Sequence, residues 1–222
     1  MDKPGSIQAL LGDQENLIDL VQRFDGAWEV PLDRTTREQA FKDALDHVLT
    51  QGPGAAIEYT LPYPKYLFLE WAVRTGTFLL HGSNGDQKQE LLPQPANDRA
   101  KKSGNQSGVY AVTDPVLPLF YAIKDRMRFR GLADSGFASE AQVAGEPKLH
   151  YRFAVPKEML VAAPWSSGMV YLLPRSSFVE QVENGAPTGE WVSTAPVRPT
   201  ATLPVGPEDF PFLSQIEAIQ EK

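Results

Sequence analysis

The sequence predicts an α+β domain in which helices come first and a strand-rich body follows. Residues 36–51 carry apolar side chains at helical spacing, and a Gly-Pro-Gly turn ends the pattern. From residue 77 onward, short apolar or alternating segments predict strands, and one helical segment at 115–123 interrupts them. Helices set apart from mostly antiparallel strands are typical of the α+β class. We therefore expect an N-terminal helical region at 1–55 and a mainly β domain at 56–222.

Composition limits the class of protein and the chemistry it can perform. The 222 residues, of which 42% are hydrophobic and 22% charged, suit a single folded domain. The absence of cysteine excludes disulfides, thiolate metal sites and a cysteine nucleophile. The three histidines lack the spacing of metal ligands, so no metal is expected.

Charge and hydropathy limit the partners. The net charge of −7 argues against broad nucleic-acid binding, which needs clustered Lys and Arg. One cluster of basic residues is expected to lie at the solvated C-terminus of a helix. Its members are Lys124, Arg126, Arg128 and Arg130. No apolar run is long enough to span a bilayer, and the first residues lack the apolar core of a signal peptide. A soluble, cytoplasmic protein with no membrane partner is the expectation.

Three helical segments are expected before the strands. Residues 5–26 show an interrupted helical pattern. Thr35 and Glu38 have the spacing of a capping box at the start of the next helix. The apolar segment 66–73 predicts a buried helix that ends near Gly76 and leads directly to the first long strand.

The later elements are expected in a definite order. Residues 77–80 predict a strand that runs out at His81, and residues 108–111 predict another strand. Asp114 is expected to cap the helix that follows, and residues 131–147 are expected to form a loop. The remaining predictions are strands at 149–155, 169–173, 191–197 and 200–205, a turn at 184–189, and a closing helix from residue 207.

Two short motifs stand out beside the expected strands. Segment 81–83 (His-Gly-Ser) follows the first strand, and segment 108–111 (Gly-Val-Tyr-Ala) precedes the inserted helix. Together they resemble the ADP-ribosyltransferase superfamily, in the His-Tyr-Glu branch that includes the poly(ADP-ribose) polymerases and diphtheria toxin. That branch carries a glutamate on a later strand, and Glu190 within 189–193 resembles this third motif. The resemblance covers residues 77–194 and is closest to a bacterial-type member of the branch.

The resemblance implies a split antiparallel β body and NAD as the substrate. NAD cleavage breaks the bond between nicotinamide and its ribose through an oxocarbenium-like state with positive charge on the sugar. A carboxylate beside the ribose stabilises that state most as the charge develops. By resemblance, Glu190 holds the ribose hydroxyl and stabilises the cation. The alternative is a solvated glutamate at a strand end.

The resemblance assigns the other site residues to parts of NAD. Tyr110 stacks its ring on nicotinamide, whereas β-propensity alone makes it a core tyrosine. Tyr121, eleven positions later, matches a second stacking tyrosine or simply packs its helix. His81 hydrogen-bonds the adenosine ribose, and Gly82 offers its backbone N–H and C=O to the carboxamide, since a residue without Cβ lets a ligand approach. The further candidate contacts are Ser83 and Asn84.

Three features depart from this pattern or add to it. Pro118 stands where the polymerases carry a serine that binds the nicotinamide amide. Thr188 stands where arginine-modifying relatives carry a second glutamate, so arginine is a less favoured acceptor. The polar segment 85–107 is either a surface loop or a border of the NAD pocket. In the second case its cations meet the pyrophosphate, and they are Arg99, Lys101 and Lys102.

The function that the resemblance implies is an NAD-dependent mono-ADP-ribosyltransferase with an unknown protein or small-molecule acceptor. An NAD glycohydrolase, in which water is the acceptor, has the same site. A non-catalytic module that binds NAD or ADP-ribose is a further alternative, because sites are grafted on folds. The last alternative is an interaction domain without an NAD site. In such a domain the side chains of His81, Tyr110 and Glu190 would point apart.

Overall fold

The computed structural model describes residues 34–95, 106–125, 128–129, 135–143, 146–183 and 185–219. The helical pattern expected at 5–26 lies outside these residues, as do Arg99, Lys101 and Lys102. The described part contains helices and two mostly antiparallel sheets, which confirms the α+β class. None of its helices is both long and apolar enough to cross a bilayer.

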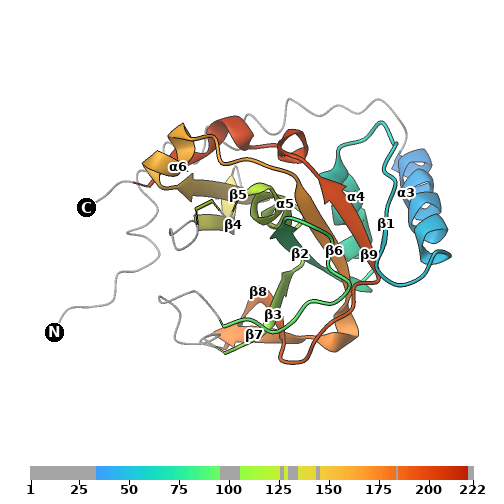
Figure 1. Cartoon of the computed structure of the whole chain (residues 1–222). Coiled ribbons are helices and arrows are strands. Elements are labelled where there is room, and N and C mark those ends of the chain that lie inside the picture. The colour runs from blue at the N-terminus through green and yellow to red at the C-terminus, as the bar shows by residue number, and fades with distance from the viewer. Residues whose placement is uncertain are drawn as a thin grey trace.

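Two helices lie side by side at the edge of the molecule, on the right in Figure 1. They are α3 (Arg34–Leu49) and α4 (Lys65–Arg74), and both positions agree with the apolar periodicity. Phe41 of α3 packs edge-on against Phe68 of α4, with 5.7 Å between the ring centroids. Both rings belong to the apolar core that also includes Leu80 of the sheet.

The start of α3 differs from the prediction. Arg34 is already helical, so Thr35 lies inside the first turn and the predicted capping box is wrong. Glu38 accepts a hydrogen bond from Arg34 at 2.9 Å and another from Arg74 at 2.8 Å. The carboxylate that the pattern assigned to a cap therefore joins the surfaces of α3 and α4.

The central sheet has seven strands. Their bounds are β1 Ala55–Ala56, β2 Phe78–Asn84, β3 Val109–Val112, β6 Gly168–Pro174, β7 Val179–Glu183, β8 Ala186–Ser193 and β9 Ala201–Val205. The strand order is β1-β9-β6-β2-β3-β8-β7, and the short pair β1–β9 is parallel while the other pairs are antiparallel. The apolar strand β2 thus lies at the centre, with a long partner in β6.

This sheet divides between β2 and β3. β2 pairs with β6 along its full length but registers with β3 only at Leu80–Val112. Figure 1 shows β3, β8 and β7 set apart from β2, β6 and β9. Side chains alternate across a strand, so Leu80 enters one apolar core while Leu79 enters a second core on the opposite face.

Helix α5 (Leu117–Ile123) crosses the middle of the sheet and packs against glycines. A Cβ atom added to Gly82 of β2 would lie 1.9 Å from the carbonyl oxygen of Pro118. One added to Gly168 of β6 would lie 2.1 Å from that of Ala122. Both distances are far inside van der Waals contact, so the two glycines allow the helix backbone to touch the sheet.

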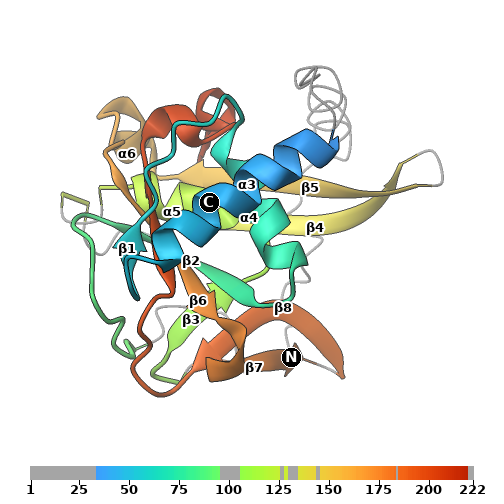
Figure 2. The same ribbon diagram turned by 90° about the vertical axis from the view of Figure 1, so that its right-hand side faces the viewer.

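A second sheet contains three strands, β4 (Ser135–Val143), β5 (Glu146–Val155) and β10 (Glu217–Ala218). The predicted loop at 131–147 is wrong over 135–143 and 146–147, where β4 pairs with β5 along its whole length. Backbone pairing with a neighbouring strand outweighs the weak β-propensity of the Ser, Gly and Ala residues there. Figure 2 shows β4 and β5 running side by side, and the short helix α6 (Lys157–Val161) follows them.

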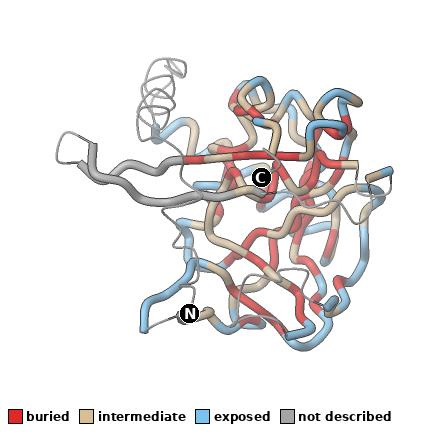
Figure 3. The backbone as a smooth tube through the Cα atoms, turned by 90° about the vertical axis from the view of Figure 1, so that its left-hand side faces the viewer, coloured by how far each residue is buried: buried red, intermediate tan, exposed pale blue. Residues whose placement is uncertain are grey.

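The predicted closing helix from residue 207 is also wrong. Two one-turn 3₁₀ helices, Pro207–Asp209 and Leu213–Gln215, flank an extended Phe210. The Phe210 and Phe212 side chains are both buried, and both rings contact Phe153. An α-helix would direct side chains two positions apart to different faces, so it could not bury both. Figure 3 shows buried positions of this kind gathered inside the molecule, with exposed positions at the turns.

Candidate functional site

His81 lies within β2, so the predicted strand end at this residue is wrong. β6 pairs with β2 as far as Asn84, and this pairing keeps the polar residues after Leu80 extended. The register with β3, in contrast, is confined to Leu80. His81 therefore occupies the point at which the sheet divides.

The imidazole of His81 links the two parts of the sheet. Its Nδ1 lies 2.6 Å from the carbonyl oxygen of Tyr110 in β3. A carbonyl only accepts, so Nδ1 donates the proton, and Nε2 is an acceptor when the ring is neutral. Along β2 the side chain starts on the face opposite Leu80, and it reaches Tyr110 because the strands separate here. The ring also packs 6.0 Å from that of the buried Tyr171, its partner on β6.

Tyr110 and Glu190 project from one face of the β3–β8 pair. Val112 lies opposite Glu190, and Tyr110 lies opposite Val192. Tyr110 and Glu190 are therefore diagonal neighbours on one face, a relation that corresponds to about 7–8 Å between Cα atoms. Trp191 points the other way, into the second apolar core. Tyr110 and Glu190 are both partly buried, so neither side chain is fully shielded from solvent.

The strand that carries Glu190 is held by its neighbours. Gly189 has φ 75°, a backbone conformation that favours glycine, and it lies inside β8 rather than in the predicted turn. Thr188 donates to the carbonyl of Gln181 on β7 at 3.0 Å and accepts from the Glu190 N–H at 3.3 Å. The guanidinium of Arg175 lies 4.2 Å from the ring centre of Trp191. Thr188 thus has a structural role at the position where the arginine-modifying members of the resembled family carry a second glutamate.

Gly82 has a packing role that the sequence did not reveal. The backbone of Pro118 occupies the place of its missing Cβ, so glycine is needed for helix packing whatever ligand binds nearby. Pro118 is buried and faces β2 through its main chain. The position at which the resembled polymerases place a serine therefore serves helix–sheet contact in this chain.

Ser83 and Asn84 both have protein partners. Lys88 donates from Nζ to the Ser83 hydroxyl at 2.8 Å, across the turn that follows β2. The Asn84 amide donates to the carbonyl of Ala122 at 3.2 Å and to the Ser166 hydroxyl at 2.7 Å. Asn84 thereby fastens the C-terminal end of α5 to the sheet.

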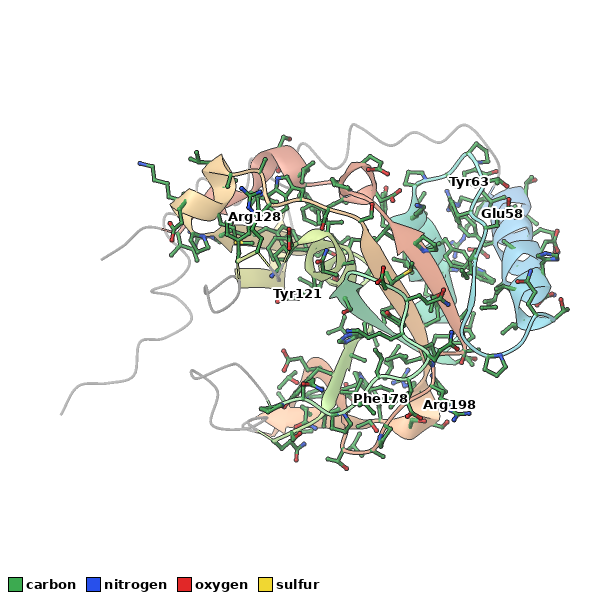
Figure 4. The ribbon with its side chains drawn as sticks, in the orientation of Figure 1. Glu58, Tyr63, Tyr121, Arg128, Phe178 and Arg198 are labelled. Atoms are coloured by element: carbon green, nitrogen blue, oxygen red, sulfur yellow. The ribbon has the colours of Figure 1, made fainter. Side chains whose placement is uncertain are left out.

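Tyr121 projects from α5, and Figure 4 shows it on the side of the helix that faces β3 and β8. Its ring is half-buried, and its hydroxyl lies 3.5 Å from the carbonyl of Gly136 in β4.

The ammonium of Lys124 lies 4.5 Å from the Tyr121 ring centre and 4.4 Å from that of Phe120. Lys124 is 0% exposed, so its predicted place in a solvated helix end is wrong. The sequence signal for this burial is that Lys124 follows Tyr121 by three residues and Phe120 by four, a spacing that places all three side chains on one helix face.

Asp114 organises the start of α5. Its Oδ1 accepts the N–H groups of Val116 at 2.8 Å and Leu117 at 2.7 Å, as an N-cap side chain does, but the helix starts two residues later than predicted, so Val116 and not Asp114 is the N-cap residue. Its Oδ2 accepts the hydroxyl of Tyr151 in β5 at 2.7 Å. Burial raises the pKa of the Asp114 carboxyl and, together with the Asp114 charge, that of the Tyr151 phenol. Tyr151 was missed because its partner lies 37 residues away in the chain.

Two hollows among the described residues lie away from these side chains. An open hollow of about 410 Å³ is lined by α3 and Trp71. A much smaller one lies between β5 and the C-terminal segment, beside Phe212. Within the described ranges, no group of His, Asp and Glu side chains is arranged to hold a metal ion. The candidate site lies at the division of the sheet, where the His81 imidazole contacts the Tyr110 carbonyl; Glu190 shares a face with the Tyr110 side chain on the β3–β8 pair, and Tyr121 lies on α5.

Comparison of the chain with protein-family models, curated proteins and solved structures finds no match.

Proposed function

We propose that the protein is an NAD-dependent mono-ADP-ribosyltransferase that binds NAD at the division of its sheet. The observation that carries the proposal is the contact of the His81 imidazole with the Tyr110 carbonyl, 2.6 Å across the division. Glu190 projects from the strand next to Tyr110, on the face that carries the Tyr110 side chain. The three residue types that the proposed NAD cleavage needs thus lie on the adjacent strands β2, β3 and β8.

Each side chain has a separate part in the proposed reaction. The Tyr110 ring gives nicotinamide an aromatic surface at little entropic cost. The neutral His81 ring, with Nδ1 donating to the Tyr110 carbonyl, offers Nε2 as an acceptor for a ribose hydroxyl. Glu190 places negative charge beside the ribose carbon. As the bond breaks, its electron pair leaves with nicotinamide and the sugar becomes cationic, so this carboxylate favours the transition state.

The acceptor distinguishes the transferase from a glycohydrolase. In both, a nucleophile attacks the ribose carbon and gives up a proton, and the nucleophile is a protein or small-molecule group in one and water in the other. Nicotinamide release is measured with and without cell lysate, and labelled ADP-ribose is followed into the lysate proteins. Labelled lysate supports the transferase, and release without labelling supports the glycohydrolase.

The catalytic assignment is tested with Glu190→Gln. Glutamine keeps the size and a hydrogen-bonding group but removes the charge, so NAD binding is expected to persist. Loss of one such electrostatic contact typically costs about 10²–10³ in rate. Glu180→Gln is the matched control, because Glu180 lies on the neighbouring strand β7 opposite Trp191. Wild-type turnover by Glu190→Gln would remove the assignment, and a wild type that binds NAD without cleaving it would make the protein a binding module.

A further inference from the structure

A buried lysine sits directly behind one of the candidate stacking rings. Lys124 follows the last residue of α5 and is 0% exposed. Its ammonium lies 4.5 Å from the centre of the Tyr121 ring and 4.4 Å from that of Phe120. Both distances are within the range of a cation–π interaction. One face of the Tyr121 ring is therefore in contact with a cation, so a ligand that stacks on this ring would use the opposite face.

The backbone around Lys124 is anchored, so the ammonium has a defined place. Lys124 forms an isolated bridge with Trp165, and the N–H of Ser166 donates to the Ile123 carbonyl at 2.9 Å. On the other side of the helix end, Asn84 donates to both Ala122 and Ser166. These bonds hold the last turn of α5 to β2 and to the chain before β6. The backbone of Lys124 is therefore fixed relative to α5, the helix that carries Tyr121.

The charge of Lys124 matters because the nicotinamide ring of NAD is itself a cation. When the bond to ribose breaks, the electron pair passes to the ring nitrogen, and nicotinamide leaves as a neutral molecule. A fixed positive charge behind the ring opposes the charged state and does not oppose the neutral one. Glu190, on the ribose side, acts in the same direction by stabilising the cationic sugar.

We infer that Lys124 is a positioning residue that presents one face of Tyr121 to nicotinamide and favours its departure as a neutral group. The inference rests on the proposed function, because it requires that nicotinamide stack on Tyr121. Lys124 does not touch the substrate; it acts through the ring. Its position predicts a selectivity between charged and neutral ligands that packing alone does not produce.

A purely structural role is the competing explanation. A cation near a helix C-terminus is favoured by the helix dipole, and its carbon chain fills apolar space. Such a role predicts that loss of the lysine weakens binding of every ligand alike. The charge effect predicts that loss of the lysine strengthens binding of NAD, whose nicotinamide is a cation, and gives no such gain for a neutral ligand. A binding measurement with both ligands therefore distinguishes the two explanations.

The experiment compares NAD with its neutral isostere in which benzamide replaces nicotinamide. Affinities are measured by calorimetry in a Glu190→Gln background, so that NAD is not consumed. Lys124→Met and Lys124→Gln both remove the charge, and the second keeps a polar head group if methionine does not fold. Lys124→Arg keeps the charge, and Lys157→Met on the exposed start of α6 is the distant control.

Removal of the charge is expected to raise the affinity for NAD relative to the neutral isostere by about tenfold, as expected for partly screened unit charges. With Glu190 intact, the same variants should release nicotinamide about tenfold more slowly. Lys124→Arg and Lys157→Met should keep the wild-type ratio of affinities. Equal changes for both ligands would overturn the inference while the proposed function stands. A wild type that binds neither ligand would overturn both.

Discussion

Replacement of Asp114 by alanine is expected to destabilise the protein strongly, because three donors share this carboxylate. The N–H groups of Val116 and Leu117 lose their acceptor, and the buried Tyr151 hydroxyl loses its partner. Loss of a helix cap typically costs about 1 kcal/mol, and an unsatisfied buried hydroxyl costs about 1–3 kcal/mol. The expected loss in the free energy of unfolding is therefore about 2–4 kcal/mol.

Urea unfolding followed by circular dichroism measures this loss directly. In a thermal scan it corresponds to a fall in Tm of between about 4 and 16 °C for a chain of this size. Asp125→Ala is the matched control, because Asp125 accepts one N–H from Arg128 at 3.0 Å in an exposed turn. Its expected cost is below about 1 kcal/mol. An Asp114→Ala protein as stable as the Asp125→Ala control would refute the role assigned to Asp114.

The pH dependence of Asp114→Asn is expected to show the cost of burying the charge. Burial raises the pKa of the Asp114 carboxyl above its usual value of 3.8, although its hydrogen bonds act in the opposite direction. The native state therefore holds this proton more tightly than the unfolded state does. The resulting stability is fully present below pH 3.8 and is lost as the pH rises through the folded pKa. Relative to wild type, Asp114→Asn should thus gain stability between acid and neutral pH, and a constant difference would contradict the shift.

Three further predictions concern the rest of the fold. Gly82→Ala should unfold at markedly lower urea than the Ser83→Ala control, because its Cβ would meet the Pro118 carbonyl at 1.9 Å; equal midpoints would show that α5 can move aside. Burial, in each case the largest cause, raises the pKa of three phenols, which belong to Tyr59, Tyr66 (to about 12) and Tyr151. Their contribution is fully present below pH 10.0 and is lost as the pH rises from there toward the folded pKa, about 12 for Tyr66, so Tm should fall between pH 10 and 12, and a flat profile would contradict their burial. Lys65→Met should destabilise the protein by about 1–3 kcal/mol in urea, since Lys65 pairs at 2.8 Å with a largely buried Asp209; a change below about 0.5 kcal/mol would make the pair structurally neutral.

Several elements were predictable from short stretches of sequence. The periodicity of Phe41, Leu45 and Val48 predicted the buried face of α3, and all three are buried. The apolar run at 169–173 predicted β6, and Asp114 predicted the start of α5 within three residues. These signals are local, because helix periodicity and capping depend on residues within one or two turns.

Other elements depended on partners far along the chain. β4 forms because β5 is available to pair with it, and its own residues carry no alternating pattern. The C-terminal segment remains extended at Phe210 because Phe153, distant in sequence, provides the contact that buries its ring. Lys124 is buried because its side chain packs against Phe120 and Tyr121 and its backbone is bridged to Trp165, whereas charge alone predicted exposure. In each case a contact across the fold outweighed the local tendency.

The same distinction applies to the features of the candidate site. The sequence by itself determined the segments that form α3 and α4, the strand that carries Tyr110, the role of Asp114 before α5 and the choice of His81, Tyr110, Tyr121 and Glu190 as candidates, because each depends on neighbouring residues. Only the tertiary structure decided that the sheet divides after the Leu80–Val112 pair, that His81 spans the division to Tyr110, and that Tyr110 and Glu190 share a face. The physical reason is that strand register and burial arise from hydrogen bonds and packing between distant segments, which no local pattern specifies.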